Sequence, residues 1–184
     1  MEIPPGKSKQ TFIFQAVMAV APAVCQNGGL REGTMANSHE FEAELIWEKG
    51  AEGERRGNHG VRFEGRPDLE VSAAPQYKGD PSCLNPEELL LASLMSCQML
   101  TYLAMAQSGD VDVLAYEDQA TATLSMADRR MRITQVTLRP RIRVGPDADK
   151  EKARKLVDRA HHGCFIANSV SCEVVIEPEV TVDT

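Results

Sequence analysis

The sequence predicts an α+β domain in which antiparallel sheets pack on one long central helix. Several segments alternate between polar and apolar residues, as half-buried strands do. One long segment is apolar on nearly all sides, which is typical of a buried helix. The segments follow one another as strands, helix, strand hairpin, second helix and strand. A chain of 184 residues is long enough for one domain with a substantial core.

Residues 1–34 differ from the remainder. They are expected to be a disordered extension, or a stretch included because the start of the protein was assigned too early. Residues 11–25 are apolar and rich in alanine, and an Ala-Pro-Ala triplet resembles a cleavage site, so a signal peptide is the alternative. A glutamate and two prolines in the leading segment argue against that alternative. We therefore expect a single domain over residues 35–184.

Three strands are expected before the long helix. Between His39 and Lys49, apolar residues alternate with glutamates, which indicates a strand with one apolar face. Residues 61–63 and 69–73 predict two shorter strands, separated by breaks at Gly65 and Pro67.

The strongest helix signal begins at Asn85, a good N-cap. Pro86 suits the first helical position and Glu88 completes a capping box. Residues 89–106 are apolar almost all round, and Gly109 ends the helix. A membrane span is the alternative, but the segment barely reaches the required length and contains several polar residues. A central buried helix is therefore predicted, with a second copy of the chain covering what one sheet leaves exposed.

Residues 111–127 and 131–144 predict two long strands joined as a hairpin at positions 128–130. Three arginines share one face of the second strand, and we interpret this face as solvated and balanced by nearby carboxylates: Arg139, Arg141 and Arg143.

A second, amphipathic helix is expected to begin at Asp147 and to end at Gly163. Residues 173–182 predict the last strand, and Pro178 indicates an edge position because proline cannot donate a ladder hydrogen bond.

Net charge and cysteine usage exclude several classes of function. A net charge of −7 and a pI of about 5.2 argue against binding to nucleic acid or to an anionic membrane, which needs clustered cations. The five cysteines are scattered and odd in number, so a disulfide-stapled secreted scaffold is not expected. The composition favours the reducing cytoplasm.

Two cysteines are the candidate reactive groups. Cys97 lies inside the apolar helix, where a small buried hydrophobe is the ordinary interpretation. Cys164 follows Gly163 at the start of a helical turn and next to His161 and His162, a setting that would lower its pKa. A small buried hydrophobe is the ordinary interpretation of Cys164 as well, and the two histidines could simply offset the dipole at the end of their helix. Of the two thiols, the local chemistry alone favours Cys164 as the more reactive.

A metal site is the second interpretation of the same residues. His161, His162 and Cys164 form a local cluster that Cys97 or His59 could join through the fold. Because no CxxC pair and no HExxH motif occurs, the sequence gives this interpretation little support, and no metal or other cofactor is predicted.

Both cysteine segments resemble those of one protein family. Residues 85–97, Asn-Pro-Glu-Glu-Leu-Leu-Leu-Ala-Ser-Leu-Met-Ser-Cys, resemble the first cysteine motif of the OsmC/Ohr proteins, the osmotically induced and organic hydroperoxide resistance peroxidases. Residues 160–169 resemble the second, and the order of elements agrees from about Ser38 to Val182. Better-studied members usually carry proline where this chain has Phe165, which places it in a less characterised branch.

The resemblance implies a cysteine-dependent peroxidase without haem or metal, working as an intertwined homodimer on organic hydroperoxides and, in addition, hydrogen peroxide. Cys97 would attack the peroxide and Cys164 would close a disulfide with it, which a dithiol reductant would reopen. The alternative is a non-catalytic dimer of the same family that responds to redox state or binds a small ligand.

The resemblance also implies that a glutamate holds an arginine near the reactive thiol. Glu87 matches the glutamate, and Arg56 is the expected arginine, with Arg55 and Arg62 as alternatives. Residues ten apart on one helix lie roughly 15 Å apart along its axis, too far for Glu87 to reach Cys97. If the helix is unbroken, Glu87 is therefore predicted to serve Cys97 of the partner subunit.

Overall fold

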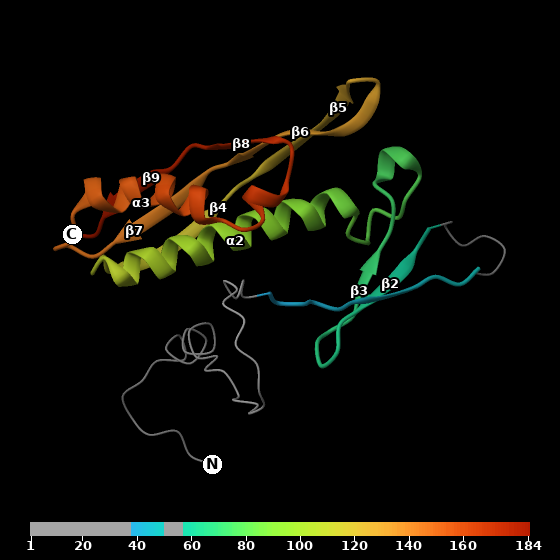
Figure 1. Cartoon of the computed structure of the whole chain (residues 1–184), viewed down its shortest axis with the longest axis horizontal. Helices are drawn as coiled ribbons and strands as arrows, with labels where there is room; N and C mark the ends of the chain where they lie inside the picture. The colour runs from blue at the N-terminus through green and yellow to red at the C-terminus, as the bar shows by residue number, and fades with distance from the viewer. Residues whose placement is uncertain (1–37, 50–56) are drawn as a thin grey trace, which may run out of the picture. The chain divides into compact units, whose positions relative to one another are not determined.

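The computed structural model describes residues 38–49 and 57–184 (Figure 1). The predicted extension over residues 1–34 and the arginine candidates Arg55 and Arg56 lie outside the described residues. In chain order the described elements are β1 (Glu44–Ile46), β2 (His59–Arg62), β3 (Leu69–Val71), η1 (Pro75–Tyr77), α2 (Pro86–Ser108), β4 (Val113–Asp118), β5 (Thr121–Ala127), β6 (Arg130–Leu138), β7 (Pro140–Val144), α3 (Lys150–Gly163), η2 (Ala167–Ser169), β8 (Glu173–Ile176) and β9 (Glu179–Val182). The expected α+β class is confirmed.

The strands form three sheets of three strands each, in the orders β1-β2-β3, β4-β7-β9 and β5-β6-β8. The expectation of purely antiparallel sheets is wrong for two of them, because β8 pairs in parallel with β6 and β9 pairs in parallel with β7. The physical reason is the connection: α3 lies between β7 and β8 in the chain, and a helical crossover returns the chain in the direction that parallel pairing needs.

The predicted strand over residues 39–49 is shorter than expected. Only β1 is regular, and it pairs with β2 alone. The apolar side chains of this segment are exposed in a single chain, with Phe41 at 93% and Leu45 at 63% of their full accessibility. Few other side chains among the described residues therefore pack against the expected apolar face of this strand.

The expected hairpin is present, but each of its two long strands is interrupted. Gln119 and Ala120 separate β4 from β5, and Arg139 separates β6 from β7. At the break, the Arg139 backbone N–H donates to Asp118 Oδ1 over 2.8 Å. As a result β5 pairs with β6 and β4 pairs with β7, so one bent hairpin contributes to two sheets.

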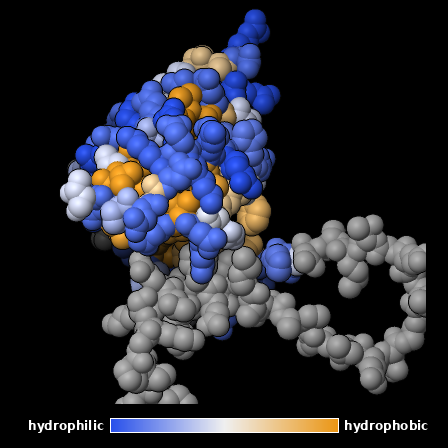
Figure 2. Space-filling view, turned by 90° about the vertical axis from the view of Figure 1, so that its left-hand side faces the viewer, coloured by the Kyte–Doolittle hydropathy of each residue, from blue (hydrophilic) through white to orange (hydrophobic). Residues whose placement is uncertain are grey.

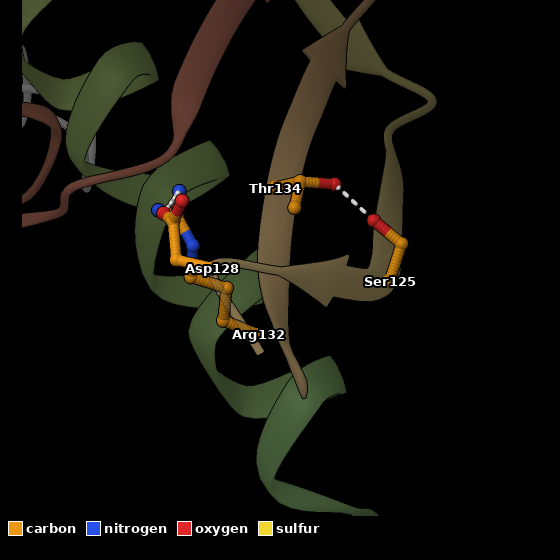
Figure 3. Close-up of polar contacts among 4 residues, drawn as sticks. All are labelled: Ser125, Asp128, Arg132 and Thr134. Atoms are coloured by element: carbon orange, nitrogen blue, oxygen red, sulfur yellow. Dashed lines mark hydrogen bonds and ion pairs between the residues drawn. The ribbon is translucent and has the colours of Figure 1, made fainter. Parts of the chain in front are cut away.

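The tip of the hairpin is a two-residue turn. Asp128 and Arg129 both have positive φ angles, of 51° and 62°, as a type I′ hairpin turn requires. Two contacts brace the tip (Figure 3): Asp128 pairs with Arg132 over 3.4 Å, and the hydroxyls of Ser125 and Thr134 lie 2.8 Å apart. The first contact links the turn to β6, and the second joins β5 to β6 next to the turn.

The arginine-bearing strand face is solvated and charge-balanced, as expected. Each arginine pairs with a carboxylate at 2.9 to 3.1 Å: Arg139 with Glu177, Arg141 with Glu117 and Arg143 with Asp183. All six side chains are about half exposed, so each pair contributes little to stability. Figure 2 shows a face of the molecule on which hydrophilic side chains predominate and apolar ones form separate patches.

Helix α2 begins as its sequence predicts. The Asn85 side chain accepts from the Glu88 N–H over 2.9 Å and the Glu88 carboxylate accepts from the Asn85 N–H over 3.1 Å, which completes the capping box. Gly109 follows its last turn. By length and composition α2 would pass as a membrane span, but core helices of water-soluble proteins pass the same test. One face of α2 is buried within the chain, while Leu100 on another face remains 50% exposed.

Helix α3 begins two residues later than expected. Asp149, not Asp147, is the N-cap, because its side chain accepts from the Lys152 N–H over 3.0 Å. The preceding residues form a turn in which Ala148 N–H donates to the Gly145 carbonyl. The expected end at Gly163 is confirmed.

Two clusters of buried side chains form the core. The larger lies where α2 and α3 pack together and against the sheet β4-β7-β9, and it includes Tyr102, Ile142 and Leu156. The smaller joins the first half of α2 to β6 through Leu94, Val136 and Leu138. The predicted last strand is two strands, β8 and β9, interrupted at Pro178, and each forms the edge of its sheet as a proline there indicates.

Candidate active site

The two candidate cysteines lie together although they are distant in the sequence. Cys97 is half-buried in the middle of α2, and Cys164 is the fully buried residue that caps the end of α3. Both are free thiols, and the Cys97 side chain lies close enough to Cys164 to raise the pKa of its thiol. The fold therefore brings two cysteines that are distant in the sequence into one site.

Close packing of α3 on α2 brings the cysteines together. A Cβ atom at Gly163 would lie 3.3 Å from Thr101 Cγ2 and 3.1 Å from Met105 Cε, closer than side chains ordinarily pack. Glycine at this position lets the last turn of α3 approach α2 one helical turn beyond Cys97. The Thr101 hydroxyl in turn donates to the Cys97 carbonyl over 2.8 Å, so it is satisfied within the helix.

Cys164 is protonated at neutral pH. Burial is the main cause that raises its pKa to about 11, and the nearby Cys97 thiol adds to the rise. The backbone N–H groups of Ala167, at 3.4 Å, and Ile166 act in the opposite direction. The turn thus supplies the expected stabilising N–H groups, but burial outweighs them, and the interpretation of Cys164 as a readily ionised thiol is wrong.

Burial of one neighbouring histidine disfavours the positive charge that was expected to act on Cys164. Burial lowers the pKa of His161, and its Nδ1 has no hydrogen-bond partner among the described residues. His162 Nδ1 donates to the Asp158 carbonyl over 2.7 Å. Across residues 38–49 and 57–184, no three His, Cys, Asp or Glu side chains come close enough together to hold a metal ion.

Glu87 lies in the first turn of α2, apart from the two thiols. The helix is unbroken from Pro86 to Ser108, so Glu87 and Cys97 of one chain are separated by nearly three turns. The Glu87 Oε2 atom is buried and has no hydrogen-bond partner in the described part of the chain. Of the arginine candidates, only Arg62 is described, and it pairs with Asp68 at the surface over 3.1 Å.

A set of buried polar side chains on α2 and β4 was not singled out from the sequence. Gln98 and Tyr102 lie on the buried face of α2, and Tyr116 and Asp118 lie on β4. Two spacings could have pointed to this set. Residues four apart share one face of a helix, as Gln98 and Tyr102 do, and residues two apart share one face of a strand, as Tyr116 and Asp118 do.

We expect the two thiols to differ in their rates of alkylation. With iodoacetamide at pH 8, Cys164 should react more slowly than Cys97, because it is buried and its raised pKa leaves it protonated. Since the thiolate fraction grows as the pH rises toward about 11, labelling of Cys164 should accelerate over that range. Mass spectrometry of digested protein measures both rates, and equal labelling at pH 8 would contradict the assignment.

Comparison with known proteins agrees with the fold and the motifs. The family described as OsmC-like protein matches residues 79–179. The solved structure of an OsmC-like protein of unknown function from Vibrio cholerae is 30% identical, with 77% of this chain and 99% of that chain covered and a TM-score of 0.72. A structure described as an organic hydroperoxide resistance protein OsmC and predicted redox protein, from Legionella pneumophila, has a TM-score of 0.61 at 18% identity, with 78% and 98% covered.

One curated relative matches over a shorter stretch. An uncharacterised protein of Methanocaldococcus jannaschii is 29% identical over 91 residues, which are 50% of this chain and 47% of that protein. The chain thus spans about half the length of this relative. With more than half of its residues matched by the family and the same fold in the solved structures, the chain belongs to the OsmC-like protein family.

Proposed function

We propose that this protein is a thiol-dependent peroxidase that reduces organic hydroperoxides, and hydrogen peroxide as a further substrate, through a Cys97–Cys164 disulfide. The observation that carries the proposal is the proximity of these two free thiols, one in α2 and one at the end of α3. Two structures of similar fold are described as organic hydroperoxide resistance proteins, which agrees with this assignment.

In the first step, the Cys97 thiolate attacks the outer oxygen of the hydroperoxide. The oxygen–oxygen bond breaks, an alcohol leaves after taking a proton, and Cys97 becomes a sulfenic acid. Cys97 suits this role better than Cys164 because it is only partly buried, whereas Cys164 is fully buried and its pKa is raised to about 11. The accessible thiol therefore meets the peroxide first.

In the second step, Cys164 attacks the sulfur of the Cys97 sulfenic acid. The sulfur–sulfur bond forms and water is released, which protects Cys97 from further oxidation. A dithiol reductant then reopens the disulfide by exchange. The four cysteines of the described residues are all free thiols, which fits a reducing compartment such as the cytoplasm.

We assign the charged residues of the site to the contact between the two subunits of a homodimer. Glu87 cannot reach Cys97 of its own chain, and its buried Oε2 has no partner there. Burying a carboxylate without a partner is costly, so a cation from beyond the described residues is the fitting contact. We assign this cation to Arg56, and we place the Glu87–Arg56 pair beside Cys97 of the partner subunit, where a guanidinium would stabilise the thiolate.

A direct assay of peroxide consumption tests the proposed function. Purified protein is mixed with cumene hydroperoxide and excess dithiothreitol, and loss of peroxide is followed over many turnovers. The rival function is a dimer that senses redox state or binds a small ligand; it would become oxidised once without turning over. Wild-type protein that consumes no more peroxide than the dithiol alone would exclude the peroxidase.

Mixing two inactive variants tests the shared site. Glu87→Ala protein and Cys97→Ser protein are mixed, unfolded and refolded together, and the activity is compared with each variant alone. If Glu87 serves the partner's Cys97, each mixed dimer has one intact site, so random pairing restores about a quarter of the wild-type activity.

The control for this mixing experiment uses the double variant Glu87→Ala/Cys97→Ser refolded with wild-type protein. In that mixture a shared site leaves the mixed dimers without an intact pair, whereas a site within one chain leaves each mixed dimer one working site. If the first mixture stays inactive and the second keeps the activity of its wild-type chains, Glu87 acts within its own subunit.

A further inference from the structure

The turn that carries Cys164 is closed by hydrogen bonds on both sides of the cysteine. Cys164 follows the last residue of α3, and η2 begins at Ala167. The Asn168 side chain donates from Nδ2 to the His162 carbonyl over 3.0 Å. The Asn168 backbone N–H donates to the Cys164 carbonyl, also over 3.0 Å. One residue of η2 therefore binds both the last turn of α3 and the cysteine that follows it.

The bond from the Asn168 side chain satisfies a carbonyl group at the end of α3. The last four carbonyl groups of an α-helix lack a partner within the helix, and the carbonyl of His162 is one of them. His162 is itself held in place, because its Nδ1 donates to the Asp158 carbonyl over 2.7 Å. Asn168 thus anchors the turn to the end of a helix and not to another loop.

Helix α3 is fixed on α2, the helix that carries Cys97. Gln98, the neighbour of Cys97, is buried, and its Nε2 donates to a backbone carbonyl of α3 over 3.1 Å. At the end of α3, Gly163 lies so close to α2 that an added Cβ atom would be 3.3 Å from Thr101 Cγ2. These contacts fix where α3 ends, and Asn168 joins the turn beyond it to that end.

The closed turn holds the Cys164 side chain inward. Cys164 is fully buried, whereas the next residue, Phe165, is 81% exposed. The Ala167 N–H donates to the Cys164 sulfur over 3.4 Å, so the thiol is held within its own turn. Because successive side chains of this turn face the core and the solvent, a change in its backbone conformation would withdraw the thiol from the core.

We propose that Asn168 is a positioning residue that keeps the thiol of Cys164 turned toward Cys97, both before and after their disulfide closes. This assignment deepens the proposed function and rests on its disulfide step. Asn168 acts through the turn that carries Cys164. Without its side chain the turn gains conformations in which the thiol is withdrawn, so the effective concentration of Cys164 at Cys97 falls.

Closure of the disulfide can be measured without peroxide. The thiolate of the more accessible Cys97 attacks an aromatic disulfide reagent, a mixed disulfide forms, and one coloured thiolate leaves. Cys164 then loses its proton to water and attacks the Cys97 sulfur, so the protein disulfide forms and a second coloured thiolate leaves. The remaining cysteines are replaced beforehand by alanine: Cys25, Cys83 and Cys172. The second release therefore reports the closing step alone.

Asn168→Ala should slow the second release by about three- to ten-fold, the effect of one hydrogen bond, and leave the first release unchanged. Asn168→Asp keeps the shape of the side chain but replaces the donor by an acceptor, so it should show at least the same deficit. Asn168 is exposed, so neither variant leaves a cavity in the core.

Ser169→Ala is the matched control. The Ser169 hydroxyl belongs to the same turn and donates to the Phe165 carbonyl over 2.7 Å. Ser169 is exposed as Asn168 is, but its side chain makes no bond to α3. Its removal should therefore change neither release.

The redox equilibrium of the disulfide separates positioning from a general loss of stability. A lower effective concentration weakens the disulfide in the same proportion as it slows closure. The reduction potential of Asn168→Ala, measured against glutathione, should therefore become less negative by about 14 to 30 mV, the same three- to ten-fold change for two electrons. Ser169→Ala should lose a similar free energy of unfolding but keep the wild-type potential.

An unchanged or faster second release in Asn168→Ala would overturn the proposal, as would an equal deficit in Ser169→Ala. If Asn168→Ala fails to fold, as judged by circular dichroism, Asn168→Asp decides the matter. A protein that shows the Asn168 deficit with this reagent but consumes no peroxide would contradict the peroxidase and leave the role of Asn168 standing.

Discussion

Replacing Cys97 by serine is expected to lower the peroxide consumption of this protein by at least about a thousand-fold. A serine hydroxyl is not ionised at neutral pH, so the side chain cannot attack the peroxide oxygen as a thiolate does. The loss should be the same in Cys97→Ser and in the double variant Cys97→Ser/Cys164→Ser, because Cys164 has no substrate without the sulfenic acid. Consumption of cumene hydroperoxide with excess dithiothreitol measures all three rates.

Two further variants serve as the comparison and the control for this result. Cys164→Ser should still form a sulfenic acid at Cys97, which a 1,3-dione reagent traps and mass spectrometry locates. Cys172→Ser, a half-buried free cysteine in the smaller core cluster, is the matched control and should keep the wild-type rate. Near-normal turnover by Cys97→Ser would show that a different group meets the peroxide.

Replacing Leu94 by alanine is expected to lower the free energy of unfolding by about 2–5 kcal/mol. Leu94 is fully buried and packs against Val136 and Leu138, the other fully buried members of the smaller core cluster. Its removal leaves a cavity one helical turn before Cys97, so the variant should also weaken the contact between the two thiols. Urea denaturation followed by circular dichroism measures the change.

The comparison variant is Leu114→Ala in β4, where the leucine is 42% exposed. It should cost less than about 1 kcal/mol, because water already reaches much of that side chain. Both variants are compared with wild type at one protomer concentration, since the stability of the proposed dimer depends on concentration. A similar loss for the two leucines would contradict the assignment of Leu94 to the core.

Local signals predicted α2 well. Asn85, Pro86 and Glu88 act within one turn of each other, so the capping box depends on nothing distant. The arginine-bearing strand face was also predictable, because alternation along one strand assigns side chains to its two faces. Both cysteine segments were identified from the residues around each thiol and from their resemblance to the two family motifs.

Other features depended on contacts that no local pattern contains. The parallel pairing of β8 and β9 follows from the path of the chain through α3, and both strands looked like one antiparallel strand in the sequence. Asp147 and Asp149 are equally good N-caps by residue type, and the preceding turn selects Asp149. The break at Arg139 depends on Asp118, which is distant in the sequence.

The reactivity of Cys164 shows most directly where sequence reasoning ends. The histidines and the turn after Gly163 are local, and they indicated a low pKa. Burial beneath α2 raises that pKa to about 11 instead, because desolvation disfavours the thiolate more than the nearby N–H groups favour it. Desolvation is a property of the packed protein and is absent from any segment taken alone.

By itself, therefore, the sequence determined the capped helix, the alternating strands and the two cysteine segments, because caps and periodicity act between residues a few positions apart. The tertiary structure decided what the resemblance had only implied, that the two thiols lie close together, and it alone decided that burial keeps Cys164 protonated. These features arise where α2, α3 and β4 pack together, and packing between distant segments sets both the distances and the desolvation that govern thiol chemistry.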